Sequence, residues 1–190
     1  MPPKTRVTES MIVDAALEIV RRSGFESINA RNVSEHLHCS TQPVMYQFST
    51  IDNLKRAAYR RADQLHSEYL MNIPAGEDPI RGIGINYIRF AVEEPQLFRF
   101  LFQSGYAEGS SLLEMVNSEE LKPVMEAMQQ GSGLSEEKTK EVFITVALFA
   151  HGYASIIANN HLVFDEKLIA SHLECAWTGA VLAAEQEGNA

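Results

Sequence analysis

The N-terminal part of the chain begins with apolar residues that recur at helical spacing. Over residues 10–23 the apolar positions fall three or four apart, which is the pattern of one face of an α-helix. Gly24 follows where helices commonly end, and Phe25 is expected to fill the core behind it. The stripe consists of Ile12, Ala15, Ala16, Ile19 and Val20. The sequence therefore predicts an amphipathic first helix.

Residues 29–48 predict two further short helices joined by a tight turn. Val33 and Leu37 give the first of them an apolar face, and Val44 and Phe48 give one to the second. Only three residues separate the two patterns. A segment of this length leaves room for a turn and for little else.

The turn and the start of its second helix have favourable chemistry. Ser40 is a good N-cap residue, and Pro43 falls in the first turn, where a missing N–H costs little. With the apolar pair turned inward, the outward positions are Thr41, Gln42, Met45 and Tyr46. A short helix with such a face, braced by another, is typical of a helix-turn-helix that enters the DNA major groove. The alternative is an ordinary helical hairpin in an all-α core.

The remainder of the chain continues the helical pattern, so the predicted fold class is all-α. No run alternates like a half-buried strand. We expect a three-helix helix-turn-helix DNA-binding domain over residues 1–52 and a helical ligand-binding and dimerisation domain over residues 53–190. Helices are expected over residues 50–70 (connecting the domains), 80–94, 96–104, 112–117, 119–130, 135–160 and 165–187.

Charge is distributed unevenly along the chain. The 190 residues carry a formal net charge of −9, with about +2 in residues 1–63 and −11 in residues 64–190. An acidic body with a mildly basic head suits a protein that binds phosphates at one end only.

The cysteines and the N-terminal residues indicate where the protein is located. The two cysteines, Cys39 and Cys175, form no disulfide framework, and no signal peptide is evident. A cytoplasmic protein is therefore expected.

Several motifs of the first third resemble the N-terminal domain of the tetracycline-repressor (TetR) family of bacterial transcription regulators. They are Ile12-Val-Asp-Ala-Ala16, Gly24-Phe25, Arg31-Asn-Val33, Ser40 through Phe48, and Leu54. Residues 87–102, together with Ala150-His-Gly-Tyr-Ala-Ser155, are similar to one C-terminal domain type of that family, which carries a His-Gly motif. The resemblance implies a homodimeric repressor that a small-molecule inducer releases from a palindromic operator in double-stranded DNA.

Two positions depart from the family pattern. Met45 stands where a phosphate-contacting Tyr is usual, and Ile51 stands where a Lys is frequent. We expect Thr41, Gln42 and Tyr46 to face base edges, with Met45 beside them on the DNA-facing surface. Arg31, near a helix N-terminus, would contact either bases or phosphates. The phosphate contacts are assigned to Lys4, Arg6, Gln47 and Lys55.

The segment from Val142 to Ala158 is almost continuously apolar, close to the lower length limit of a membrane span. No basic flank anchors it, and charged residues precede it. A helix that is apolar all round must be buried on both sides, so a second subunit is expected to cover it in a four-helix bundle. The predicted dimer contacts are small residues spaced by four: Ala150, Ala154 and Ala158, and Ala176, Ala180 and Ala184.

Aromatic residues are dense between residues 87 and 106, which suggests an inducer pocket. The expected lining is Tyr87, Phe90, Phe98 and Phe102, with His151 and Tyr153 as further polar tips. A Phe stripe at helical spacing is also what an ordinary core requires.

Other classes of function have weaker support in the sequence. A helical metalloenzyme would need paired Glu-x-x-His motifs, and the chain offers only Glu35-x-x-His38 and Asp63-x-x-His66. No nucleophile elbow, phosphate loop or zinc spacing is present, so we expect no catalytic residue, metal or cofactor. A helical ligand-binding module that has lost DNA recognition is the remaining alternative.

Overall fold

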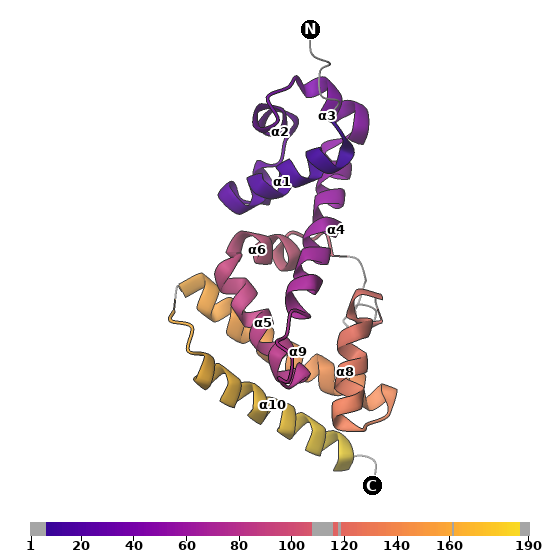
Figure 1. Ribbon diagram of the computed structural model, residues 1–190, viewed down its shortest axis with the longest axis vertical. Helices are drawn as coiled ribbons and strands as arrows, with labels where there is room; N and C mark the ends of the chain where they lie inside the picture. Colours follow the sequence, from indigo (N-terminus) through magenta and orange to yellow (C-terminus); the bar gives the residue numbers. More distant parts are fainter. Residues whose placement is uncertain (1–6, 108–115, 118, 161, 187–190) are drawn as a thin grey trace. The chain divides into compact units, whose positions relative to one another are not determined.

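The computed structural model describes residues 7–107, 116–117, 119–160 and 162–186, and these contain helices and turns without a strand (Figure 1). Packing divides the chain into two units. The first comprises residues up to 65 together with 94–107, and the second comprises residues 66–93 and 108–190. The predicted functional boundary between residues 52 and 53 falls near the start of a helix that runs through both units.

The first unit begins with α1 (Glu9–Ser23). Thr8 is its N-cap, with the side-chain oxygen accepting from the N–H of Met11 at 3.3 Å. Gly24 ends the helix at φ 81°, and its N–H donates to the carbonyl of Val20. All five residues of the predicted apolar stripe are buried, and so are Val13 and Leu17. The periodicity therefore predicted the correct face and underestimated its width.

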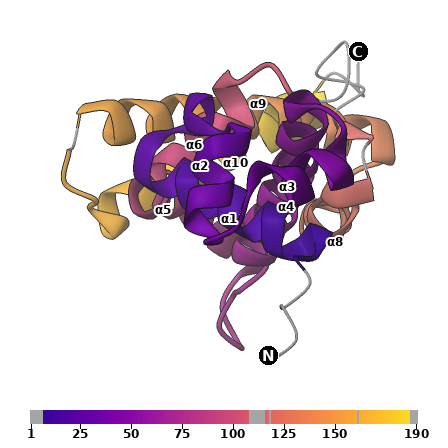
Figure 2. The same ribbon diagram turned by 90° about the horizontal axis from the view of Figure 1, so that it is seen from above.

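The next helices are α2 (Ala30–His36), α3 (Thr41–Phe48) and α4 (Ile51–Leu70), after a 3₁₀ turn over Phe25–Ser27. Figure 2 shows α1, α2 and α3 gathered around the start of α4. Val33, Val44 and Leu54 are fully buried, one from each of the last three helices. Their burial stabilises the helix-turn-helix, because each apolar side chain removed from water contributes about 1.5–3 kcal/mol.

The short helix α6 (Pro95–Gln103) also belongs to the first unit and packs against α1. Pro95 occupies its first position, one residue before the predicted start, where a missing N–H costs little. Phe100 is fully buried and stacks on Phe25 with ring centroids 5.5 Å apart. The Tyr59 hydroxyl of α4 donates to the carbonyl of Leu101 at 3.2 Å. Thus α6 completes the core of the unit that contains the helix-turn-helix.

The second unit contains α5 (Pro79–Glu93), a 3₁₀ turn over Glu119–Leu121, α8 (Lys122–Ser132), α9 (Glu136–Asn160) and α10 (Glu166–Gln186). Helix α9 packs against α5, α8 and α10. The helix predicted to end at residue 130 extends two residues further, because α8 continues through Gly131 to Ser132, where Gly133 caps it with φ 69°. The helix predicted over residues 112–117 lies mostly outside the described residues.

Two glycines in α5 permit close packing. A Cβ at Gly84 would lie 3.0 Å from the Leu173 side chain of α10, and one at Gly82 would lie 2.8 Å from Ile73. Their backbone is part of a regular helix. The glycines in this otherwise helical pattern are therefore explained by the neighbours that approach them.

Helix α9 has two different faces. Val142, Ala150, Ala154 and Ile157 are buried within the chain, whereas Phe149 and Ile156 are among its exposed residues. By length and composition the helix could cross a membrane, with a mean hydropathy of 1.6 over its most apolar window. One face nevertheless packs on neighbouring helices of the same unit.

The six alanines predicted as dimer contacts differ in how far the chain itself buries them. Ala150, Ala154 and Ala184 are buried against their own chain, and Ala158, Ala176 and Ala180 are partly buried. Small residues at these positions let the helices of one chain approach one another. The exposed apolar residues are instead Leu148, Phe149 and Ile156 on α9, and Leu168 and Leu182 on α10.

Candidate nucleic-acid interface

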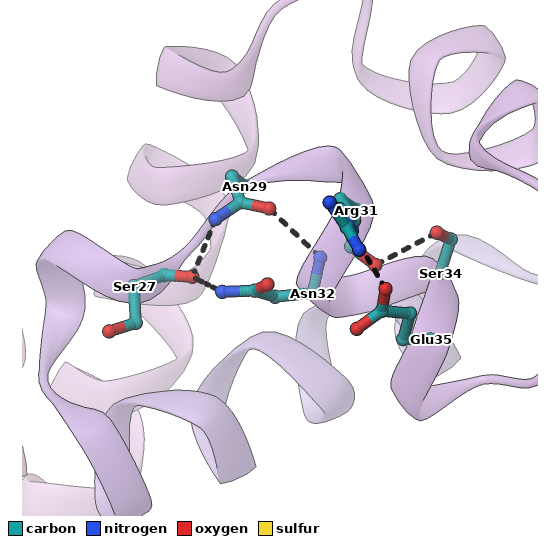
Figure 3. A network of polar contacts seen from close by, with 6 residues as sticks. All are labelled: Ser27, Asn29, Arg31, Asn32, Ser34 and Glu35. Atoms are coloured by element: carbon teal, nitrogen blue, oxygen red, sulfur yellow. Dashed lines mark hydrogen bonds and ion pairs between the residues drawn. The ribbon is translucent and has the colours of Figure 1, made fainter.

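The start of α2 is held by a network of polar contacts around Asn29 (Figure 3). Asn29 is the N-cap, and its side-chain oxygen accepts from the N–H of Asn32 at 2.8 Å. The side-chain amides of both asparagines donate to the carbonyl of Ser27, at 3.3 and 2.8 Å. A cap of this kind contributes about 1 kcal/mol. It fixes where α2 begins, and so positions the helix that braces α3.

The turn between α2 and α3 has a backbone that is unusual for its residue types. His38 adopts the left-handed region at φ 51°, where glycine is favoured. The next N–H, of Cys39, donates to the carbonyl of Ser34 at 2.9 Å. Ser40 occupies the N-cap position of α3, as predicted, but its side chain makes no capping hydrogen bond. The exit angle of the turn therefore depends on the backbone of His38 rather than on a Ser40 cap.

Helix α3 presents the face that its spacing predicts. Val44 and Phe48 are buried, while Thr41 and Gln42 are exposed. Met45 is 39% exposed, and Tyr46 is 80% exposed. These four side chains project from a helix whose opposite side is anchored in the core. Their assignment to base contacts stays a prediction.

The junction between α3 and α4 is constrained by Asn53, which the sequence reasoning did not single out. Its side-chain amide donates to the carbonyl of Phe48 at 3.0 Å, and its N–H donates to the Thr50 hydroxyl at 3.1 Å. Ser49 between them has φ 58°. The Thr50-x-x-Asn53 spacing at a helix start was the available signal. These bonds position α3 relative to α4.

The predicted phosphate-contacting residues differ in their surroundings. Gln47 of α3 and Lys55 of α4 are half-buried. The Arg31 side chain is 83% exposed and donates to the Glu35 carboxylate at 2.8 Å (Figure 3). That hydrogen bond raises the pKa of Arg31, which therefore stays charged. Lys4 and Arg6 lie outside the described residues.

A second cation near the start of α4 has defined partners. Arg56 donates to Asp52 at 2.9 Å, and its guanidinium lies 5.5 Å from the ring centroid of Tyr106. The Tyr106 hydroxyl donates to the same carboxylate at 3.1 Å. The bond from Arg56, followed by that from Tyr106, lowers the pKa of Asp52. This cluster links the segment after α6 to the first turn of α4.

The six residues predicted to line an inducer pocket fall into two groups. Tyr87, Phe90, His151 and Tyr153 belong to the second unit, and Phe98 and Phe102 to the first. The Tyr87 hydroxyl lies 2.9 Å from Nδ1 of His151, within hydrogen-bond distance. The rings of Phe98 and Phe102 lie 4.9 Å apart. Phe90 and Phe98 are almost fully buried, so both are core residues of their units.

The structure adds His66 to the group in the second unit. Its ring lies 4.8 Å from that of Phe90 and 5.5 Å from that of Tyr87, both edge-on. Burial lowers the pKa of His66 to about 4 and lowers that of His151, whereas it raises the pKa of Tyr87. All three groups are therefore neutral at pH 7. A histidine on an otherwise apolar helix face was the sequence signal for this position.

The six predicted lining residues are absent from two hollows on the surface of the described residues. One lies by the end of α8, beside Glu126, Gln129 and Leu134. The other, in the first unit, is bordered by residues such as Met11, His36 and Arg61. In the same described part of the chain, no three His, Cys, Asp or Glu side chains cluster as metal ligands would.

Comparisons with known proteins agree with this architecture. The family model described as "Tetracyclin repressor-like, C-terminal domain" matches residues 80–174. No curated protein matches the sequence significantly. A TetR-family transcriptional regulator from Streptomyces coelicolor is similar in structure, with a TM-score of 0.68 and 16% identity over 95% of this chain and 85% of that one.

Two other solved structures have the same fold. A TetR-like transcriptional regulator from Rhodococcus sp. RHA1 has a TM-score of 0.62 and 15% identity over 94% of this chain and 97% of that one. The multidrug binding protein EbrR complexed with ethidium has a TM-score of 0.55 and 16% identity over 93% of this chain and 99% of that one.

A helix-turn-helix at the N-terminus, followed by a larger helical domain, defines a class of DNA-binding regulators. The chain belongs to the TetR family of transcriptional regulators, with a C-terminal domain of the matched type. Members of this family are regulators rather than enzymes.

Proposed function

We propose that this protein is a cytoplasmic homodimeric repressor that binds a palindromic operator and is released by a small-molecule inducer. The observation that carries the DNA-binding part is the exposed face of α3, whose opposite side is fixed by buried Val44 and Phe48. Gln42 can bond adenine through two hydrogen bonds, and Thr41 can contact a thymine methyl. Arg31 of α2 and Lys55 of α4 supply positive charge in the same unit.

The proposal of a dimer is supported by the apolar side chains left exposed on α9 and α10. Leu148, Ile156 and Leu182 are each more than half exposed, an unusual state for a long apolar helix pair in a soluble chain. Gly152 and Gly179 have no neighbouring atom near the position of a Cβ, so a second helix can approach closely there. A second copy that covers these faces would form a four-helix bundle with twofold symmetry.

An inducer is supported by the polar groups within the second unit and by the ligands of one structural relative. Neutral Tyr87 and His151 provide a polar pair among apolar side chains, which is a composition typical of small-molecule sites. EbrR was solved with ethidium and with imidazole. A ligand that binds one conformation better than another would shift the equilibrium away from DNA binding.

The test is selection of binding sites from random duplex DNA by the purified protein. The expected result is a twofold-symmetric sequence with half-sites one or more helical turns apart. Gln42→Ala should lose about 1–3 kcal/mol of preference for that sequence. Lys55→Ala should weaken binding to all sequences and reduce the salt slope by about one unit. Failure to enrich any sequence would instead support a ligand-binding module without DNA recognition.

A further inference from the structure

A buried asparagine in α5 holds the C-terminal end of α4. The Asn86 side chain is buried, and its Nδ2 lies 3.2–3.3 Å from three main-chain oxygens, those of Tyr69, Leu70 and Asn72. The last carbonyls of a helix have no partner within the helix, so they need one from elsewhere. Here the Asn86 side chain, from another helix, donates to the last two carbonyls of α4, those of Tyr69 and Leu70.

The other end of the same amide is also engaged. Arg89 donates through Nη1 to Oδ1 of Asn86 at 3.1 Å, which fixes the orientation of the amide. Through Nη2 the guanidinium donates to Glu166 at 2.6 Å, in the first turn of α10. The guanidinium also lies over the ring of Phe164, 5.4 Å from its centroid. A continuous polar path therefore runs from the end of α4, through α5, to the start of α10.

This arrangement does more than satisfy hydrogen bonds locally. Helix α4 is the element through which the chain passes from the helix-turn-helix unit into the second unit. Helix α10 carries Leu168 and Leu182, two of the five exposed apolar residues on α9 and α10. Asn86 and Arg89 thus contact the end of α4 on one side and, through Glu166, the start of α10 on the other.

We propose that Asn86, held by Arg89 and Glu166, is a positioning residue that sets the spacing at which the two DNA-binding heads of the dimer engage their half-sites. This inference rests on the proposed function, since it requires a dimer that reads two half-sites. A firmly held α4 makes the spacing of the heads definite. One additional base pair between the half-sites turns one of them by roughly 35° around the duplex axis. A rigid dimer therefore binds a site with this altered spacing less tightly than a site with the selected spacing.

The experiment measures binding to duplexes that carry the half-sites selected by the wild-type protein at their selected spacing, and at spacings one base pair shorter and longer. A separate duplex carries a single half-site. We expect the wild type to prefer the selected spacing by about tenfold or more. Asn86→Leu should reduce this preference to about threefold or less, with single half-site affinity within about twofold of wild type.

Asn72→Ala is the matched control. Asn72 is exposed and contributes only its main-chain oxygen to the contact, which alanine retains. This variant should keep the wild-type spacing preference. Arg89→Gln and Glu166→Gln remove the hydrogen bonds of Arg89 to Asn86 and Glu166 with less disturbance of the core. They test the positioning role of Asn86 if Asn86→Leu does not fold. Each should loosen the spacing preference, and the double variant should loosen it no further than Arg89→Gln alone.

Two results would overturn the proposal in distinguishable ways. If the wild type binds all spacings equally, the dimeric repressor itself is wrong, and the assigned role of Asn86 fails with it. If the wild type discriminates while Asn86→Leu and Arg89→Gln discriminate equally well, the dimer stands and the positioning role is wrong.

Discussion

Arg21 of α1 donates through Nε to both carboxylate oxygens of Glu94, each at 3.1 Å, although 73 positions separate the two residues. Glu94 directly precedes α6, and both side chains are about one-third exposed. The same guanidinium donates to Glu18 at 2.8 Å. The pair therefore attaches the start of α6 to the helix that supports the DNA-binding motif.

Loss of this pair should loosen α6. Arg21→Met is expected to lower the free energy of unfolding by about 1 kcal/mol, because the charge-assisted bonds are lost and solvent screens this partly exposed pair only in part. The measurement is urea denaturation followed by circular dichroism, at low and high salt. Arg22→Met, at the exposed neighbouring position, is the control and should have little effect. Equal losses in both variants would contradict the role assigned to the Arg21–Glu94 pair.

Replacing His38 by glycine should stabilise the protein. His38 has φ 51°, a conformation that costs residues with a Cβ more than it costs glycine, so His38→Gly is expected to gain about 0.5–1 kcal/mol. The control is His36→Gly, at the end of α2, where helical backbone makes glycine unfavourable by a few tenths of a kcal/mol. Thermal unfolding distinguishes the two. A loss of stability in both variants would mean that the His38 side chain contributes more than its backbone costs.

Stability should fall between pH 6.5 and pH 4 because His66 is buried in its neutral form. Its pKa is about 4 in the folded protein and about 6.5 when unfolded, so the unfolded state binds the proton more readily. The stabilisation that comes from neutral His66 is fully present above pH 6.5. As the pH falls toward 4 it is lost, which lowers the free energy of unfolding by on the order of 3 kcal/mol. His66→Phe should flatten this part of the profile.

The check on His66 is denaturant unfolding at half-unit pH steps, with His36→Gln as the control at an exposed position. The control should retain the wild-type slope. If His66→Phe also retains it, another group is responsible for the acid sensitivity.

A glutamate introduced on the exposed face of α9 should affect the dimer, whereas one introduced on its buried face should affect the fold. Ile156 is 58% exposed, so Ile156→Glu should leave the fold intact and yield monomers if this face forms the dimer. Ala154 is fully buried within the chain, so Ala154→Glu should destabilise the fold by several kcal/mol. Sedimentation and circular dichroism separate these outcomes. Met71→Glu, at an exposed apolar residue after α4, should remain dimeric, and a wild type that sediments as a monomer would refute this interface.

The sequence was most informative where one face of a helix is apolar and the other is not. The stripe of α1 and the inward pair Val44 and Phe48 of α3 follow from spacing alone, and the structure confirms their burial. Helix α9 is apolar on all sides, so periodicity could not say which face packs on the same chain. Three of the six predicted alanines, Ala150, Ala154 and Ala184, are buried within the chain, and the place of the stripe in a dimer interface stays a prediction.

Contacts between distant segments could not be read from local patterns. Nothing near Asn86 in the sequence indicates that its partners are the last carbonyls of α4, because those acceptors belong to the main chain. His66 was considered only as part of a metal-ligand spacing, although its neighbours in space are Tyr87 and Phe90. Chain topology, rather than residue type, decides both sites.

Because α6 belongs to the first unit, that unit is built from two separate stretches of the chain. In topological terms, residues 66–93 are an insertion, after which the chain returns to complete the unit that it left. A fragment that ends at residue 65 would lack the partners of Phe25 and Tyr59. An autonomous DNA-binding fragment must therefore retain residues 94–107 together with the residues up to 65, since truncation at residue 65 removes part of its core.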